Sequence, residues 1–160
     1  MICEMETSLN QVLKSLQRIC SKQEKCPAEI MEYLVRKGIP EEFHQPVVVR
    51  LIADRFIDEE RYAKAAVSDK FMLNRWGKQK IRHFLETKQI SEEIMERAMN
   101  IIEPSDYRKM IEEELHKKMS ALSGEQHGMR EMKILRFAAS RGYEEETVRE
   151  ICTISGQENL

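Results

Sequence analysis

The sequence predicts an all-α protein, built as an elongated, curved array of three tandem three-helix repeats. Glycine and proline are scarce, with 6 and 4 among 160 residues, so the chain has too few turn formers for a sandwich or barrel of many hairpins. Glu, Lys, Arg, Met and Leu, which suit long helices, are abundant. An apolar pattern that recurs along the chain then indicates how the helices are grouped.

The recurring pattern occupies residues 30–39, 81–90 and 134–143. Each segment follows Ile-x-x-aromatic-(Leu/Ala)-x-x-basic-(Gly/Gln)-apolar, and their starts are 51 and 53 residues apart. The Ile, the aromatic residue and the Leu or Ala stand at positions i, i+3 and i+4, which share one face of a helix. The pattern therefore predicts one equivalent amphipathic helix in each of three units.

Each of these helices carries its own end signal. A cation stands in the last turn, at Lys37, Lys88 and Arg141, where it faces the negative end of the helix dipole. Gly38 and Gly142 follow directly, and glycine favours the left-handed backbone that closes a helix. The second unit has Gln89 at this position, which must adopt the same backbone or let the helix end differently.

Neighbouring patterns predict the other helices of each unit. Acid-rich helix starts follow each end signal, and Ser91 is the best N-cap among them. A longer amphipathic helix precedes each repeated helix, with Ser8 as the expected N-cap in the first unit. A unit of about fifty residues buries only a modest core by itself, so we expect the units to stack. The expected domains are residues 1–55, 56–103 and 104–160.

No catalytic motif stands out, so we expect neither enzyme activity nor a cofactor. The four histidines are scattered, and acid pairs on a chain with 28 acidic residues are typical of solvated helix faces. Cys3, Cys20, Cys26 and Cys152 form no CxxC pair, which predicts reduced, mostly buried thiols and no metal. A disulfide or a metal-binding pair among them stays an open alternative.

Signals for export and for membrane insertion are also missing from the sequence. The N-terminus has no apolar run behind a basic start, and no segment approaches 18 uncharged residues. These features favour a cytoplasmic location without membrane contact.

The net charge of −2 argues against a polycationic nucleic-acid coat, because affinity for DNA rises with the number of phosphates neutralised. Any nucleic-acid contact must therefore be local.

The main local feature is a basic stretch at residues 70–88. Six cations and one acid give it a net charge of +5 in a chain of −2. Gly77 precedes an expected helix start, whose free N–H groups also favour anions. The stretch therefore predicts a site for phosphate or an acidic partner. Its candidate binding residues are Lys70, Arg75, Trp76, Lys78, Lys80, Arg82 and Lys88.

Two interpretations of Trp76 stay open. Either its ring is a stacking plane beside the cations, or it packs into the core and the lysines only make the surface soluble.

A second basic stretch in the third unit adds Arg130, Lys133 and Arg136 as candidate contacts. If the units stack in register, the two stretches form one discontinuous basic face. Acid-rich segments elsewhere make a charge mosaic, which suits a protein partner of both signs.

Three motifs of the second unit occur in a fixed order: residues 57–63, IDEERYA, residues 77–81, GKQKI, and residues 85–90, LETKQI. In these motifs the unit resembles the RecX family of bacterial recombinase regulators. The family pattern runs approximately Leu-Asp-Asp-x-Arg-Phe-Ala, then Gly-x-x-x-Ile-x-x-Glu-Leu-x-x-Lys-Gly-Ile. Phe84 and Gln89 depart from it, where the family usually has Glu and Gly. Tandem three-helix repeats agree with the family's architecture.

The resemblance implies a regulatory protein that is not an enzyme. Members of the family bind the RecA recombinase filament on single-stranded DNA, lie along its helical groove, and mainly inhibit its ATPase, strand-exchange and coprotease activities in recombination, DNA repair and the SOS response. We expect a monomer that contacts RecA and, weakly, single-stranded DNA. Two alternatives stay open: a helical module that binds single-stranded nucleic acid by itself, and an interaction scaffold for an unrelated partner.

Overall fold

The structure is a computed structural model that describes residues 2–157 of the chain, with side chains described for residues 9–153. Within residues 2–157 the chain forms α-helices and one short 3-10 helix, and no strand. The predicted all-α class with tandem three-helix repeats is therefore confirmed. The helices are α1 (Ile2–Cys20), α2 (Pro27–Arg36), α3 (His44–Ala53), α4 (Glu59–Met72), α5 (Lys78–Thr87), α6 (Glu92–Met99), α7 (Pro104–Ala121), α8 (His127–Arg141) and α9 (Glu145–Gln157).

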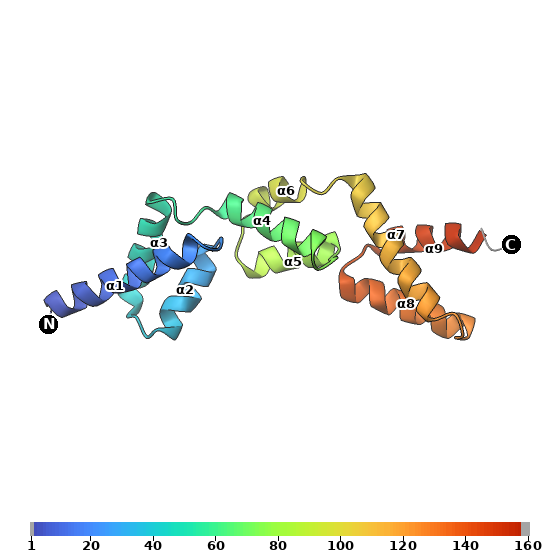
Figure 1. Cartoon of the computed structure of the whole chain (residues 1–160), viewed down its shortest axis with the longest axis horizontal. Coiled ribbons are helices and arrows are strands. Elements are labelled where there is room, and N and C mark those ends of the chain that lie inside the picture. The colour runs from blue at the N-terminus through green and yellow to red at the C-terminus, as the bar shows by residue number, and fades with distance from the viewer. Residues whose placement is uncertain (1, 158–160) are drawn as a thin grey trace.

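The three units follow one another along the long axis of the molecule (Figure 1). The first unit, α1 to α3, lies at one end, α4 to α6 form the middle, and α7 to α9 form the other end. Helices of neighbouring units are joined by residues 54–58 and 100–103. The expected boundaries at 55/56 and 103/104 fall at these links, and the division into separate domains stays a prediction.

The repeated helix ends in the same way in all three units. Gly38, Gln89 and Gly142 have positive φ angles of 67, 59 and 78°. The N–H of the following residue donates to a carbonyl five residues back, which closes the last turn in a Schellman motif. The left-handed backbone predicted at the two glycines is confirmed, and Gln89 adopts it too. The closing bonds are Ile39 to Leu34 (3.1 Å), Ile90 to Leu85 (3.2 Å) and Tyr143 to Ala138 (3.0 Å).

Predicted helix starts were right in the second unit and wrong in the first. Ser91 caps α6, because its hydroxyl accepts a hydrogen bond from the Ile94 N–H at 3.4 Å. Ser8 is not an N-cap, since α1 begins at Ile2; the preceding residues contain no Gly or Pro to stop the helix. A 3-10 turn, Glu41–Phe43, precedes α3, which places Pro46 in the first turn of that helix.

The core is divided into two clusters of buried side chains. The first unit has its own, centred on Leu16, Ile30, Leu34 and Leu51. The second cluster runs without a break from the second unit into the third. The latter two units therefore bury their apolar faces against each other, as the small size of each unit predicts. Its largest fully buried members are Val67, Ile81, Leu85, Met95, Met110, Ile111, Leu115 and Val148.

The described cysteines are free thiols. Cys20 and Cys26 are buried, Cys152 is half-buried, and none of the three is in a disulfide. Burial raises the pKa of each of these thiols, because an apolar environment disfavours the thiolate. The prediction of reduced, buried thiols therefore holds for these three. The side chain of Cys3 lies outside the described part of the chain.

Candidate functional site

The basic stretch at residues 70–88 lies partly where the second unit meets the third. The loop that enters α5 contacts the turn between α8 and α9, and the Gly77 N–H donates to the Arg141 carbonyl at 2.8 Å. We call this contact the seam, formed by residues 74–80 of the second unit and residues 139–144 of the third. It places the start of α5 directly against the third unit.

Two glycines allow the backbones to approach at the seam. A Cβ atom at Gly77 would overlap the Gly142 carbonyl, and one at Gly142 would overlap Lys80. Because neither residue has a side chain, the Gln79 N–H can also reach the Gly142 carbonyl, at 3.3 Å. The direct contact between backbones sets the position of every cation around the seam.

Two buried tyrosines hold the seam by further hydrogen bonds. The Tyr107 hydroxyl accepts from the Lys78 N–H at 2.9 Å and donates to Glu144 Oε2 at 2.6 Å. The Tyr143 hydroxyl donates to the Arg75 carbonyl at 2.9 Å. Burial raises the pKa of both phenols, that of Tyr143 to about 12. Both hydroxyls are therefore protonated donors at neutral pH.

Trp76 stands at the seam between two lysines. Its ring is half-buried and packs edge-on against Phe84, with 6.2 Å between the ring centroids. Lys70 Nζ lies 5.0 Å and Lys80 Nζ 4.6 Å from the centroid of the indole, within the range of cation–π attraction. Lys80 Nζ also donates to the Ser140 carbonyl at 2.8 Å. We call Lys70, Trp76, Lys80 and Phe84 the lysine–tryptophan cluster. The half-buried ring packs against Phe84, and its role as a stacking plane stays a prediction.

The other cations of the stretch are already engaged within the molecule. Lys78 Nζ lies 4.7 Å from the centroid of the Tyr107 ring. Carboxylates from other helices pair with the remaining three, and ion pairs at exposed positions contribute only about 0–1 kcal/mol. The local charge of +5 is therefore partly compensated in the fold. The pairs are Arg75 with Glu113 (2.7 Å), Arg82 with Glu92 (2.7 Å) and Glu96 (2.6 Å), and Lys88 with Glu29 (3.6 Å) and Glu32 (3.9 Å).

The candidate cations of the third unit differ in their surroundings. Arg130 is half-buried, and its Nη2 donates to the Met119 carbonyl at 3.3 Å. Lys133 pairs with Glu125 across the link between α7 and α8. Arg136 is exposed on α8. Of these three, Arg136 is the most accessible to a partner.

The two basic stretches meet only at one end of α8. Arg141, in the last turn, donates from Nη1 to the Asn74 carbonyl at 3.0 Å, which brings it to the seam. Arg130 and Lys133 lie in the first half of the helix, and eight residues of helix separate Lys133 from Arg141, or about 12 Å. The start of α8 lies away from the second unit and its end lies at the seam (Figure 1), so any basic face formed by the two stretches is discontinuous, and that face stays a prediction.

Two exposed apolar residues at the end of α4 were not predicted as contact residues from the sequence. Met72 and Leu73, at the end of α4, are 63% and 76% exposed, and Leu73 stands one turn after Lys70. Their signal was available: they follow Phe71 directly, so they cannot lie on the buried face that the apolar spacing of α4 indicates. Exposed apolar side chains beside a polar rim are typical of contact surfaces.

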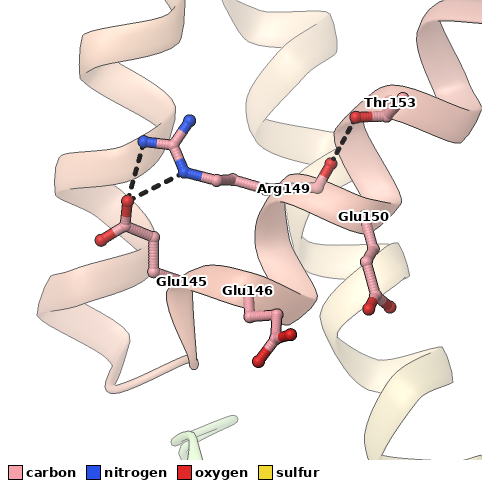
Figure 2. Close-up of a pocket in the computed structure, with 5 residues that line it drawn as sticks. All are labelled: Glu145, Glu146, Arg149, Glu150 and Thr153. Atoms are coloured by element: carbon pink, nitrogen blue, oxygen red, sulfur yellow. Dashed lines mark hydrogen bonds and ion pairs between the residues drawn. The ribbon is translucent and has the colours of Figure 1, made fainter.

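A hollow on the surface of α9 carries no comparable site. Its lining is dominated by carboxylates, with Arg149 as the one cation among the lining residues (Figure 2). Glu145 holds the Arg149 guanidinium, with 2.7 Å between Nη2 and Oε1, so the cation is neutralised. The lining residues are Glu145, Glu146, Arg149, Glu150 and Thr153. This acidic hollow offers no free group for an anionic ligand.

The described residues contain neither a candidate metal site nor a helix that could span a membrane. No group of three or more His, Cys, Asp or Glu side chains is close enough to hold a metal ion in the part of the chain that the structure describes. Among the same residues, no helix combines the length and the apolar character needed to cross a bilayer.

The middle unit matches a known protein family. Residues 58–99, from the N-cap of α4 to the end of α6, match the family model described as the second three-helix domain of RecX. The regulatory protein RecX of Clostridium tetani (strain Massachusetts / E88) is 24% identical over 136 residues, which cover 84% of this chain and 62% of that protein. The chain thus spans less than two thirds of the length of this curated relative.

Solved structures share the whole fold. A crystal structure of regulatory protein RecX superposes with a TM-score of 0.83 at 21% identity, over 95% of this chain and 77% of that one. The crystal structure of RecX from Lactobacillus salivarius gives a TM-score of 0.78 at 17% identity, over 97% of this chain and 99% of that one. The likeness therefore extends the match of the middle unit to the arrangement of all three units.

Proposed function

From the match of residues 58–99 to the second three-helix domain of RecX, we propose that this chain is a RecX-type regulator that binds RecA filaments on single-stranded DNA and mainly inhibits their ATPase, strand-exchange and coprotease activities. The proposed regulation works by binding and involves no chemical step. A protein that prefers one state of the filament shifts the filament toward that state by its differential affinity. Since bacterial recombination takes place on cytoplasmic DNA, the proposal also places the protein in the cytoplasm.

The elongated array supports this function. Three similar units lie in a row along the molecule, and a filament offers repeated copies of one surface. A first contact raises the effective concentration of the next, so several weak contacts give strong binding overall. A single unit is expected to bind far more weakly than the complete chain.

The single observation that carries the proposed contact is an exposed apolar residue, Leu73, one helical turn after Lys70 of the lysine–tryptophan cluster. Leu73 is 76% exposed, and Trp76 and Lys80 extend the same region toward the seam. Met72, two residues after Lys70, lies on another side of α4. Interface centres combine apolar and aromatic anchors with a polar rim. The matching partner surface is an apolar recess with acidic side chains at its edge.

The remaining candidate cations belong to the proposal as secondary contacts. Arg75 and Arg82 can exchange their carboxylate partners for carboxylates or phosphates of another molecule at small cost, since exposed ion pairs are weak. Lys78, over the Tyr107 ring, and Lys88, in a largely buried pair with Glu29, are less available secondary contacts. Arg130, Lys133 and Arg136 of the third unit supply a second point of contact. Because most of these cations are paired in the free protein, direct affinity for single-stranded DNA should be weak and its salt dependence shallow.

A double variant tests the contact. Leu73→Ser with Lys70→Glu removes the apolar anchor and reverses one rim charge, and we expect at least a tenfold loss of apparent affinity in the inhibition of the DNA-dependent ATPase of RecA. The matched control, Val49→Ser with Lys109→Glu, changes an exposed apolar residue and an exposed lysine elsewhere. Equal inhibition by both variants would refute the assignment of this surface.

The same samples separate the proposal from its alternatives. Co-sedimentation with RecA filaments, with naked single-stranded DNA and with free RecA should show binding to the filament only. Tight binding to naked DNA that falls steeply with salt would identify a nucleic-acid-binding module instead. No binding to any of the three would leave a scaffold for another partner.

A further inference from the structure

A cavity of about 750 Å³ lies within the third unit, between α7, α8 and α9. Ile134, Leu135 and Val148 form apolar parts of its wall. Another part of the lining is polar and consists of groups that can donate hydrogen bonds: His116, Ser120, Ser123, His127 and Arg130. The cavity is therefore amphipathic, and its polar part is rich in donors.

One of these donors has no acceptor. Arg130 Nε is fully buried and makes no hydrogen bond, although Nη2 of the same guanidinium reaches the Met119 carbonyl. A buried N–H without an acceptor is unfavourable by about 1–3 kcal/mol, and more for a charged group. Nε itself has no accessible surface, so a ligand in the cavity can meet this guanidinium only through its Nη groups, and the cavity is large enough for a small molecule that brings an acceptor to them.

The charges around the cavity favour an anion as that acceptor. The lining contains one carboxylate, Glu131, which lies 3.6 Å from Arg149 Nη1. Glu131 and Arg149, which both line the cavity, compensate each other, and Glu145, the second partner of Arg149, is not part of the lining. None of the described carboxylates pairs with Arg130. In addition, α8 begins at His127 on the cavity wall without a side-chain cap. The positive end of the dipole of α8 therefore adds to the positive electrostatic potential in the cavity.

We propose that this cavity binds a small amphipathic anion. An oxyanion headgroup accepts from Arg130, with the hydroxyls and histidines of the rim as further donors, and a flat apolar body lies against Ile134, Leu135 and Val148. Phosphate, sulfonate and carboxylate groups share this chemistry, because each presents several acceptor oxygens to a guanidinium. The site does not depend on the proposed docking to RecA.

Anilinonaphthalene sulfonate is a suitable probe, since it joins an anionic head to a flat apolar body and fluoresces when it is bound. We expect saturable binding to the complete folded protein, with shifted NMR signals for the rings of His116 and His127. N-phenylnaphthylamine has a similar body without the sulfonate, and it should bind about tenfold more weakly. Equal binding of the neutral probe would overturn the proposal.

Variants then test the assigned residues. Arg130→Gln should weaken binding of the sulfonate about tenfold, whereas Arg136→Gln, an exposed arginine on the same helix, should leave it unchanged. Ser120→Trp fills the cavity from an exposed position on α7 and should abolish binding while circular dichroism stays native. Binding that survives Arg130→Gln and Ser120→Trp in folded protein would overturn the proposal. Separate titrations with aliphatic phosphates and carboxylates identify the preferred headgroup.

Discussion

A methyl group at position 77 is expected to open the contact between the second and third units. Gly77 has φ −75° and ψ 163°, a conformation that any residue adopts, so Gly77→Ala introduces no backbone strain. The added Cβ instead overlaps the Gly142 carbonyl and the ring of Tyr143. The obstructing atoms are largely backbone, which cannot move aside as the end of a flexible side chain does.

The structure sets the size of the effect. Overpacking of this kind costs about 1–3 kcal/mol. Separation of the backbones also weakens two hydrogen bonds, from the Gly77 N–H to the Arg141 carbonyl (2.8 Å) and from the Gln79 N–H to the Gly142 carbonyl (3.3 Å). Each is worth about 1 kcal/mol, so we expect Gly77→Ala to lower the free energy of unfolding by roughly 3 kcal/mol in total.

Two other glycines serve as controls. Gly124 has open space around its Cβ position and no positive φ, so Gly124→Ala should change stability little. Gly38 also has open space but φ of 67°, so Gly38→Ala should cost only the strain of a left-handed alanine, about 1 kcal/mol. Urea unfolding followed by circular dichroism measures all three variants. If Gly77→Ala costs no more than Gly124→Ala, the tight approach of the backbones at the seam is refuted.

Three further predictions concern caps, hydrogen bonds and ion pairs. Gln89→Gly should raise the free energy of unfolding by about 0.4–1 kcal/mol, because glycine takes the left-handed φ of 59° without strain; unchanged urea stability would contradict this. Tyr143→Phe should lower it by about 1–2 kcal/mol, by leaving the Arg75 carbonyl without its donor, in the same urea assay. Burial raises the pKa of Tyr143 to about 12, so as pH rises the unfolded state loses the phenol proton before the folded state does. The free energy of unfolding should therefore fall between about pH 10 and 12, and the fall should be smaller in Tyr143→Phe. Arg82→Gln should cost less than about 1 kcal/mol in thermal unfolding, because its two ion pairs are largely exposed; a larger loss would mean that they hold α5 to α6.

Much of the architecture could be predicted because its signals are local. The apolar spacing at i, i+3 and i+4 is a property of neighbouring residues, and so are the ends of α2 and α8 at Gly38 and Gly142. The start of α1 was misplaced, since a serine such as Ser8 costs only about 0.5 kcal/mol inside a helix, and the preceding residues favour helix. For this reason, an N-cap residue in the sequence locates the start of a helix less reliably than a glycine locates its end.

The candidate site was only partly predictable from the sequence. The basic stretch was evident, and Lys70 and Lys80 do lie close to the Trp76 ring, but the other cations of the stretch face different helices. The carboxylates that pair with Arg75 and Lys88, however, come from residues 38 and 59 positions away. Local charge counts cannot include such partners, so the net +5 overstated the free charge.

The sequence by itself determined the helical class, the three units and their period, and the residues that end the repeated helix. These depend on backbone preferences and on spacing within one or two turns, which act before any distant contact forms. Only the tertiary structure decided which units share a core, that Gly77 and Gly142 meet, and that the cations around Trp76 are partly engaged. Those outcomes depend on atoms from segments tens of residues apart, whose approach is set by packing of the whole array.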